Sequence, residues 1–211
     1  MQTSSSPQWA VPDSTGMRAS CSRGWSSVPS RSGCRVGTTC STRLRRSWLP
    51  PKGWGKILHE LRLGELAALH LIPHTPYYGT ADATPLYLLV LHATWRATGD
   101  LDLLRRHLRT AEGCLSWIDD YGDRDGDGFQ EYGTRSGQGY ENVGWKDSGE
   151  AVVNTDGSKV SNPKALCELQ GYVYAAWQGM AEVHSSLGDQ DRADALSAKA
   201  AALFERFNAV F

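Results

Sequence analysis

The sequence predicts an all-α domain of helical hairpins, and it favours an α/α toroid as the architecture. Apolar residues recur at steps of three and four through most of the second half of the 211-residue chain, as expected for amphipathic helices. The connections alternate between very short links, Gly99 and 188–189, and one very long link, 122–162. Short links join antiparallel neighbours, whereas a long irregular link in a compact domain usually carries function. A helical solenoid would share these features, but no short repeat of the solenoid type is visible.

Ordered structure is expected from residue 53 onward and begins with a segment of ambiguous type. Residues 56–71 fit either a short helix or an extended segment. The first long helix should start near Thr84 and Pro85, because proline suits a first helical turn, and should end at Gly99. Its apolar residues lie nearly all round the helix, which predicts burial on every side. These residues are Leu86, Leu88, Leu89, Val90 and Leu91.

Three further helices are predicted at about 100–121, 164–187 and from about 190 onward, with Gly188 between the last two. Each carries one apolar stripe that should face a common core. The stripes include Leu101, Leu104, Leu108, Leu115 and Ile118; Leu166, Leu169, Val173, Met180 and Val183; and Ala193, Leu196, Leu203 and Phe207. Cys114 and Cys167 fall at core-like positions, so we expect both to be buried as small apolar residues.

Composition excludes several classes of protein. An apolar content of 40% and eight tryptophans indicate a packed core, and a net charge of −1 argues against nucleic acid as a partner. No apolar run is long enough for a transmembrane helix, and the N-terminus lacks the apolar centre of a signal peptide. The five cysteines have no metal-type spacing. We therefore expect a cytoplasmic protein that contacts no membrane.

Residues 1–52 differ from the rest of the chain and receive no assigned function. They hold eight Arg and Lys, twelve Ser and three Cys, with Asp13 as the single acid. A disordered basic tail explains the Ser and Arg but not the scattered Trp9, Trp25 and Trp48. We hypothesise a frame-shifted segment, because this composition is typical of GC-rich DNA read out of frame. Resequencing of the gene tests it, and an intact frame with the codon usage of 53–211 would contradict it.

The long link opens with an acidic stretch that resembles half of a calcium loop. Asp123, Asp125, Asp127 and Gly128 match the first half of an EF-hand, but Thr134 occupies the twelfth position, where a bidentate Glu is needed. The sequence therefore predicts a loop ordered by its own Asx turns and no cofactor. Weak calcium binding by the three aspartates is the alternative.

The remaining chemistry of the two loop regions consists of carboxylates and aromatic rings, which suits sugar. Pyranose rings stack their apolar faces on Trp and Tyr, and carboxylates accept hydrogen bonds from the sugar hydroxyls. Hydrolysis of a glycosidic bond needs two carboxyl groups, one as acid and one to activate water. The candidates are Tyr77, Tyr78 and Asp82 in the first loop and Glu131, Tyr132, Glu141, Trp145 and Asp147 in the second.

Four segments in this order and spacing resemble bacterial amylo-α-1,6-glucosidase or glycogen-debranching-like glycoside hydrolases. They are GKILHELRLGELA, PHTPYYGTADATPLYLL, DYGDRDGDGFQEY and GWKDSGEAVV, and ELQGYVYAA also fits. The resemblance covers about residues 55–211. It implies an (α/α)6 toroid of the six-hairpin glycosidase type that cleaves α-glucosidic bonds with inversion. Residues 53–211, with about four of the twelve helices, would be a central fragment of that catalytic domain.

The resemblance also implies roles for particular residues. Asp147, in the Trp-Lys-Asp-Ser motif, would be the general acid, and the substrate would be an α-glucan oligo- or polysaccharide. The residues expected to line or flank the sugar are Tyr77, Tyr78, Asp82, Glu141, Trp145 and Lys146. A donor carboxyl needs its pKa raised, by burial or by a neighbouring carboxylate such as Glu141.

The catalytic base would lie beyond Phe211, so the isolated fragment should be inactive. Without the remainder of the catalytic domain, its apolar stripes, such as Leu196, Leu203 and Phe207, should face water or another chain. Two alternatives stay open. One is a trehalase-like or mannosylglycerate-hydrolase-like glycosidase of the same fold, and the other is a non-catalytic helical module that binds carbohydrate.

Overall fold

The structure is a computed structural model that describes residues 55–134 and 137–210. The hypothesis about residues 1–52 lies outside this range. The described residues form five helices: α2 (Glu65–Ala68), α3 (Ala83–Thr98), α4 (Leu101–Tyr121), α5 (Cys167–Ser186) and α6 (Gln190–Val210). Extended pairing within them is confined to isolated bridges such as Glu60 with Tyr77. The all-α class is therefore confirmed for the described residues. None of their helices combines the length and the apolar character needed to cross a membrane.

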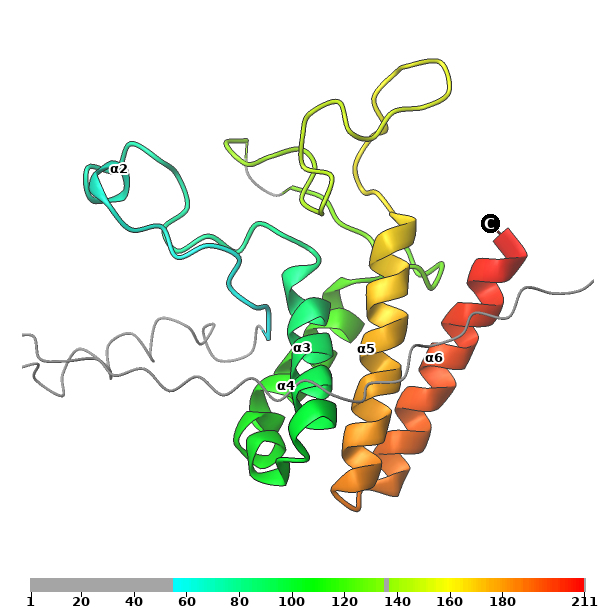
Figure 1. The fold of residues 1–211 in the computed structure, drawn as a ribbon. Helices are drawn as coiled ribbons and strands as arrows, with labels where there is room; N and C mark the ends of the chain where they lie inside the picture. The colour runs from blue at the N-terminus through cyan, green and yellow to red at the C-terminus, as the bar shows by residue number, and fades with distance from the viewer. Residues whose placement is uncertain (1–54, 135–136, 211) are drawn as a thin grey trace, which may run out of the picture. The chain divides into compact units, whose positions relative to one another are not determined.

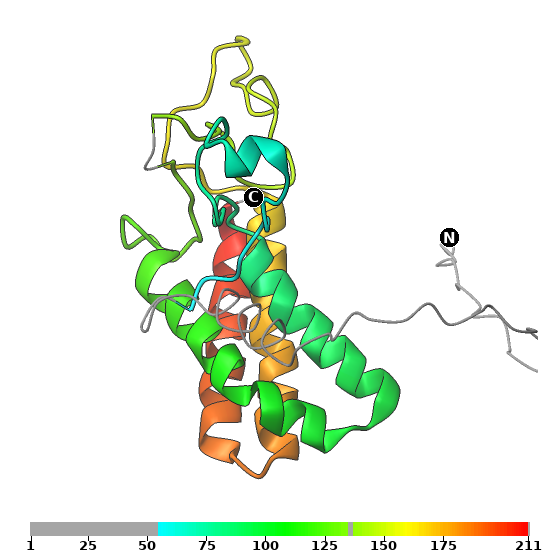
Figure 2. The same ribbon diagram turned by 90° about the vertical axis from the view of Figure 1, so that its left-hand side faces the viewer.

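The four long helices make two hairpins, α3 with α4 and α5 with α6, whose short links lie at the same end (Figures 1 and 2). Gly99 and Gly188 adopt left-handed φ values of 69° and 86°, which glycine reaches without a Cβ clash. Asp100 then caps α4, because its Oδ1 accepts hydrogen bonds of 2.9 Å from the amides of Asp102 and Leu103. These local signals explain why the helix boundaries agree with the predicted ones.

Helix α5 lies at the centre of the core and packs against α3, α4 and α6. Its stripe is buried against the stripes of its neighbours, as predicted. The expectation that the α6 stripe faces water is wrong for Leu196 and Leu203, which are 0% and 4% exposed because α5 covers them. Fully buried side chains include Leu88, Leu104, Leu115, Ile118, Val173, Met180, Val183 and Leu196.

Two other burial predictions need correction. Helix α3 is buried on one face only: Leu88 is 0% exposed, whereas Val90 is 64% exposed, because among the described helices only α4 and α5 pack against α3. Cys167 is exposed because it begins α5 on the side away from the core, whereas Cys114 is buried. Burial raises the pKa of the Cys114 thiol to about 12, so it acts as the small apolar residue that the sequence suggested.

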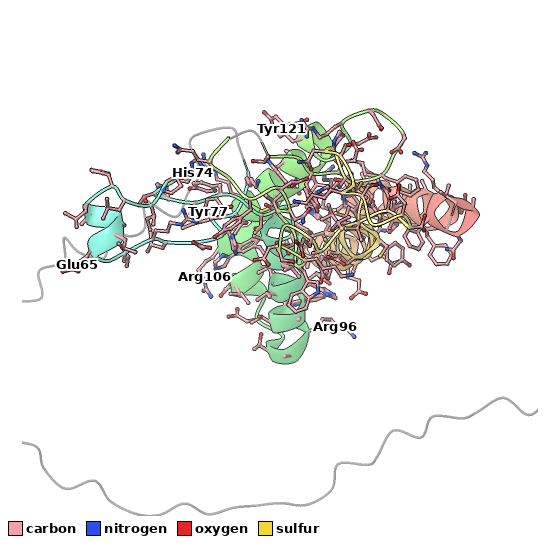
Figure 3. The ribbon with its side chains drawn as sticks, turned by 90° about the horizontal axis from the view of Figure 1, so that it is seen from above. Glu65, His74, Tyr77, Arg96, Arg106 and Tyr121 are labelled. Carbon is pink, nitrogen blue, oxygen red and sulfur yellow. The ribbon has the colours of Figure 1, made fainter. Side chains whose placement is uncertain are left out.

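For residues 56–71 the sequence left a short helix or an extended segment open. In the structure this segment is mainly irregular and contains the short helix α2. Helix α2 contacts none of the four long helices, and it lies away from them when viewed from above (Figure 3). The bridge between Glu60 and Tyr77 joins the two ends of the segment 60–77, which contains α2. Its tip carries exposed leucines, namely Leu63, Leu66, Leu69 and Leu71.

Candidate functional site

The two loop regions singled out by the sequence meet at the end of the helices opposite the short links (Figure 1). The amide of Ala81, just before α3, donates a hydrogen bond of 2.7 Å to the carbonyl of Val143 in the long loop. Within the long loop, Tyr132 and Lys164 exchange backbone hydrogen bonds of 3.0 and 2.9 Å. These bonds join segments far apart in sequence into one surface that can bear a site.

A buried glutamine fixes the first part of the long loop against α5. The side chain of Gln170 accepts from the amide of Gln130 and donates to its carbonyl, both at 2.7 Å. Its Nε2 also donates to the carbonyl of Leu166 at 3.1 Å. A side-chain amide that pairs with both backbone groups of one residue acts like a short piece of β ladder. It sets the position of Glu131 and Tyr132, which follow directly.

The acidic stretch is ordered by its own side chains, as predicted. The two carboxylate oxygens of Asp123 accept from the amides of Gly126 and Gly128 at 2.7 and 2.9 Å. Asp125 and Asp127 accept from the amides two residues further on, at 3.1 and 2.8 Å. These are Asx turns, in which the aspartate side chain replaces a backbone acceptor.

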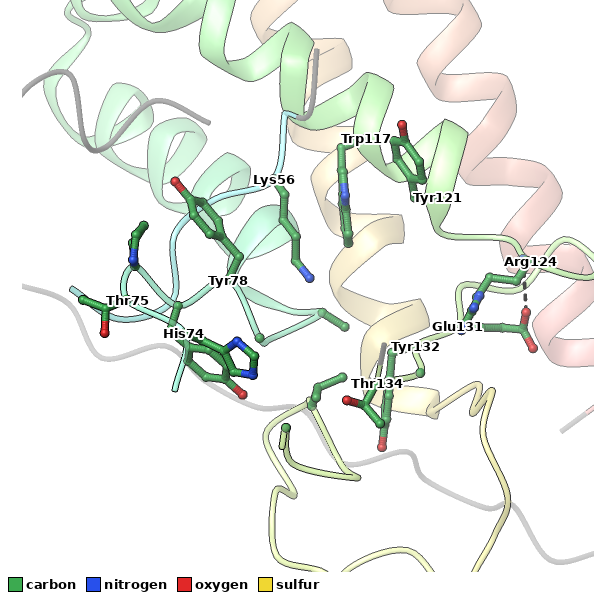
Figure 4. Close-up of a pocket in the computed structure, with 17 residues that line it drawn as sticks. Lys56, His74, Thr75, Tyr78, Trp117, Tyr121, Arg124, Glu131, Tyr132 and Thr134 are labelled. Atoms are coloured by element: carbon green, nitrogen blue, oxygen red, sulfur yellow. Dashed lines mark hydrogen bonds between the residues drawn. The ribbon is translucent and has the colours of Figure 1, made fainter. Parts of the chain in front are cut away.

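In the structure, the residues that could form the alternative calcium site differ from the three aspartates that the sequence suggested. Ligand atoms of Asp123, Asp125 and Glu131 lie within 4.8 Å of one another, and Asp127 does not belong to this group. Burial raises the pKa of Glu131, and the three aspartates raise it further, against the hydrogen bond from the amide of Arg124 (dashed in Figure 4). Exposed acidic groups are common without a metal, so this trio supports no metal assignment.

Beside this loop lies a cavity of about 560 Å³, which we call the aromatic cavity. Figure 4 shows that its labelled side chains come from Lys56 with 74–78, from the end of α4 and from 124–134; Gly79, Ala81, Gly139 and Val143 complete the lining. Its rings are Tyr77, Tyr78, Trp117, Tyr121 and Tyr132, and its charged groups are Lys56, Arg124 and Glu131. The Lys56 Nζ lies 5.0 Å from the centre of the Trp117 ring. A cavity of this size accepts one small ligand.

Tyr77 forms a buried wall of the aromatic cavity, with 5% of its surface exposed. The guanidinium of Arg62 lies 4.0 Å from the ring centre, in cation–π geometry. The rings of His74 and Tyr140 lie 5.9 and 6.5 Å away. A Cβ on Gly79 would collide with the Tyr77 ring, so the glycine leaves room for it. Tyr77 is therefore fixed by packing before any ligand binds.

Asp147 does not line the aromatic cavity. Its charge acts on the pKa of Tyr77: burial raises this pKa most, Arg62 lowers it, and the charges of Glu60 and, least of all, Asp147 raise it. Asp147 and Lys146 are both exposed.

Trp145 and Asp82 come together at a second, much smaller cavity. It has a volume of about 10 Å³, which holds about one water molecule. Glu168, in the first turn of α5, also lines it, and the Glu168 Oε1 is buried without a hydrogen-bond partner among the described residues. The outer side of Trp145 is open, since 72% of the residue is exposed. The indole can therefore present a face to a ligand.

Glu141 lines neither of these two cavities. Its carboxylate lies 3.6 Å from the Nζ of Lys164 and 4.0 Å from the Nζ of Lys159. The neighbour proposed for Asp147 is therefore engaged with two lysines.

Sequence reasoning missed several residues of this region, among them Lys56, Trp117, Tyr121, Arg124, Lys164 and Glu168. Trp117 and Tyr121 are four apart on the last turns of α4, so they share a face next to the long loop. That spacing was available as a signal. Lys164 and Glu168 offered none, because their burial depends on segments distant in sequence.

In comparisons with known proteins, no family model matches the chain and no curated protein matches it.

Proposed function

We propose that residues 53–211 are a central part of an (α/α)6 glycoside hydrolase of the amylo-α-1,6-glucosidase or glycogen-debranching type. Such an enzyme cleaves α-glucosidic bonds with inversion. The observation that carries the proposal is the aromatic cavity at the long-loop end, next to the loop that bears Asp147. The two hairpins with their short links at the opposite end are the units from which an α/α toroid is built.

The aromatic cavity suits a sugar in size and chemistry. Its volume of about 560 Å³ lies in the range of small-ligand sites. Tyr78 and Trp117 offer rings for the apolar faces of a pyranose. Lys56 and Glu131 offer a donor and an acceptor for its hydroxyls. On this proposal Trp145 and Asp82 bound a neighbouring part of the substrate, beside the smaller cavity.

Asp147 is the proposed general acid, which protonates the glycosidic oxygen. By the resemblance, the partner of Asp147 would be a glutamate that activates the water on the opposite face of the sugar. Inverting enzymes hold these two carboxyl groups ~6.5–9.5 Å apart. Because Asp147 is exposed, the role requires that the substrate and further parts of the toroid exclude water from it. Lys146 and Glu141 would then act only as neighbours of the acid.

A second candidate is binding of carbohydrate without hydrolysis. The observation that favours it is the exposure of Asp147, together with its position outside the lining of the aromatic cavity. A proton donor usually requires a site shielded from water, whereas ring stacking and hydroxyl recognition tolerate an open surface.

Titration of the 211-residue chain with sugars tests both functions. We expect calorimetry or ligand-observed NMR to detect binding of isomaltose and panose, with trehalose and mannosylglycerate as the alternative glycosides and cellobiose as control. Trp117→Leu should abolish binding, whereas Trp95→Leu should not, because Trp95 is also half-buried but does not line the cavity. Failure of the folded chain to bind any of these sugars would contradict both functions.

Turnover separates the two functions. A full-length relative that carries the same motifs should release glucose from a branched limit dextrin, and Asp147→Asn in it should not. Sugar binding without turnover in that relative would favour the non-catalytic module.

A further inference from the structure

We propose that Lys164 and Asn142 are positioning residues that hold the loop 143–149 in place for the sugar site. That the loop serves a sugar site rests on the proposed function, but the contacts that hold the loop do not depend on it. Neither residue occurs among those that the sequence suggested, and neither lines the aromatic cavity.

Lys164 is a buried cation with few partners. Only 2% of its side chain is exposed. Its Nζ donates a hydrogen bond of 2.6 Å to Oδ1 of Asn142 and lies 3.6 Å from Oε1 of Glu141. A buried ammonium destabilises a fold unless its charge and donors are met, so the partners of Lys164 are fixed in turn.

Asn142 links Lys164 to the loop 143–149. It is 1% exposed, and its Oδ1 accepts from Lys164 and, at 3.4 Å, from the hydroxyl of Tyr132. Two donors on the oxygen leave the amide nitrogen facing the other way. There Nδ2 donates to the carbonyl of Ser148 at 2.5 Å. That carbonyl also accepts from the amide of Ala151 at 3.1 Å.

The loop is therefore tied at two points. The carbonyl of Val143 accepts from the amide of Ala81, and the carbonyl of Ser148 accepts from Asn142. Between these points the side chains of Trp145, Lys146 and Asp147 are exposed, and none of them makes a hydrogen bond to another described residue. Their positions consequently depend on the two ties, and the second tie depends on Lys164.

Lys159 provides a matched control. It also faces Glu141, at 4.0 Å, but its side chain is 57% exposed and it donates no hydrogen bond to Asn142. A simple loss of one positive charge near Glu141 should affect both lysines alike. Loss of the tie should affect only Lys164.

The experiment measures backbone ¹⁵N order parameters and isomaltose affinity in the 211-residue chain and its variants. In Lys164→Met, the order parameters of residues 144–149 should fall from the rigid range, about 0.85, to below about 0.6, with α3–α6 unchanged. Lys159→Met should leave them unchanged. Asn142→Asp keeps the acceptor for Lys164 and replaces the donor to Ser148 with a carboxylate oxygen, which cannot bond that carbonyl, so it should loosen the loop in the same way.

The outcomes separate this inference from the proposed function. A loosened loop with at least ~10-fold weaker isomaltose binding supports positioning of the sugar site; a loosened loop with unchanged binding overturns it. If the parent chain binds no sugar, the proposed function fails, and the order parameters alone decide whether the tie exists. If Lys164→Met does not fold, Asn142→Asp decides. An ordered loop in folded Asn142→Asp overturns the inference.

Discussion

Replacement of Gln170 with leucine should lower the free energy of unfolding by about 2–4 kcal/mol. The buried side chain makes two 2.7 Å hydrogen bonds to the backbone of Gln130, and leucine makes neither. Each bond contributes about 1 kcal/mol, and an unsatisfied buried backbone group costs about 1–3 kcal/mol. The two unsatisfied groups of Gln130 together would cost about 2–6 kcal/mol. Because water can reach part of the freed loop, we expect the lower half of that range. The loss is substantial against a typical total of about 5–15 kcal/mol.

Urea unfolding monitored by far-UV circular dichroism measures this change, with Gln178→Leu as the control. Gln178 lies on the same helix, is exposed, and bonds only the hydroxyl of Tyr174. Its replacement should change the free energy of unfolding by less than about 0.5 kcal/mol. If Gln170→Leu also changed it by less than about 0.5 kcal/mol, the amide would not hold the loop, and the reasoning about Glu131 and Tyr132 would fail.

Four further outcomes are expected. Asp147→Asn in a full-length relative should cut turnover at least ~10²-fold. The loss of turnover should be smaller on glucosides with very good leaving groups. Near-normal turnover of an oligosaccharide would show that Asp147 is not the general acid. Trp145→Ala should weaken sugar binding by ~1–3 kcal/mol and leave the melting temperature unchanged, since the residue is 72% exposed; a lower melting temperature alone would assign it to packing. Burial raises the pKa of Tyr132 to about 12, so this group contributes stability that is complete below pH ~10 and lost as pH rises through ~12. Urea titrations at these two pH values should show about 2 kcal/mol more loss in the parent chain than in Tyr132→Phe, and equal losses would contradict that assignment. The isolated chain should release no glucose from a branched limit dextrin and should self-associate through its exposed leucines. Sedimentation of a Leu66→Lys and Leu71→Lys double variant should show less association. Robust turnover by a monomer would show that a base exists within the chain.

The helices could be predicted from the sequence because their signals are local. A stripe such as Leu196 to Leu203 repeats with the period of the helix, and Gly99, Asp100 and Gly188 mark ends through their own backbone chemistry. The bonds from aspartate side chains to backbone amides in 123–129 were predictable for the same reason, since each spans two to five residues.

The site could be predicted only as a set of residue types on two loops. The sequence indicated that Tyr77, Tyr78 and Trp145 belong to loops, but it did not say that the first two line a cavity while the indole lies outside it. Loops have no period from which the direction of a side chain follows. The place of Trp117 next to the long loop follows from the chain, because α4 runs directly into that loop, but only packing brings residues 74–78 to the same cavity.

The sequence by itself determined where helices begin and end and which of their faces are apolar, because these depend on contacts within a few residues. The tertiary structure decided which apolar faces are covered, as the contrast between buried Leu88 and exposed Val90 shows. It also decided that Lys164 is buried, although lysine is rarely so. Burial sums contributions from every segment that packs nearby, and for Lys164 those segments include Tyr132 and 141–142, more than twenty residues away in the chain.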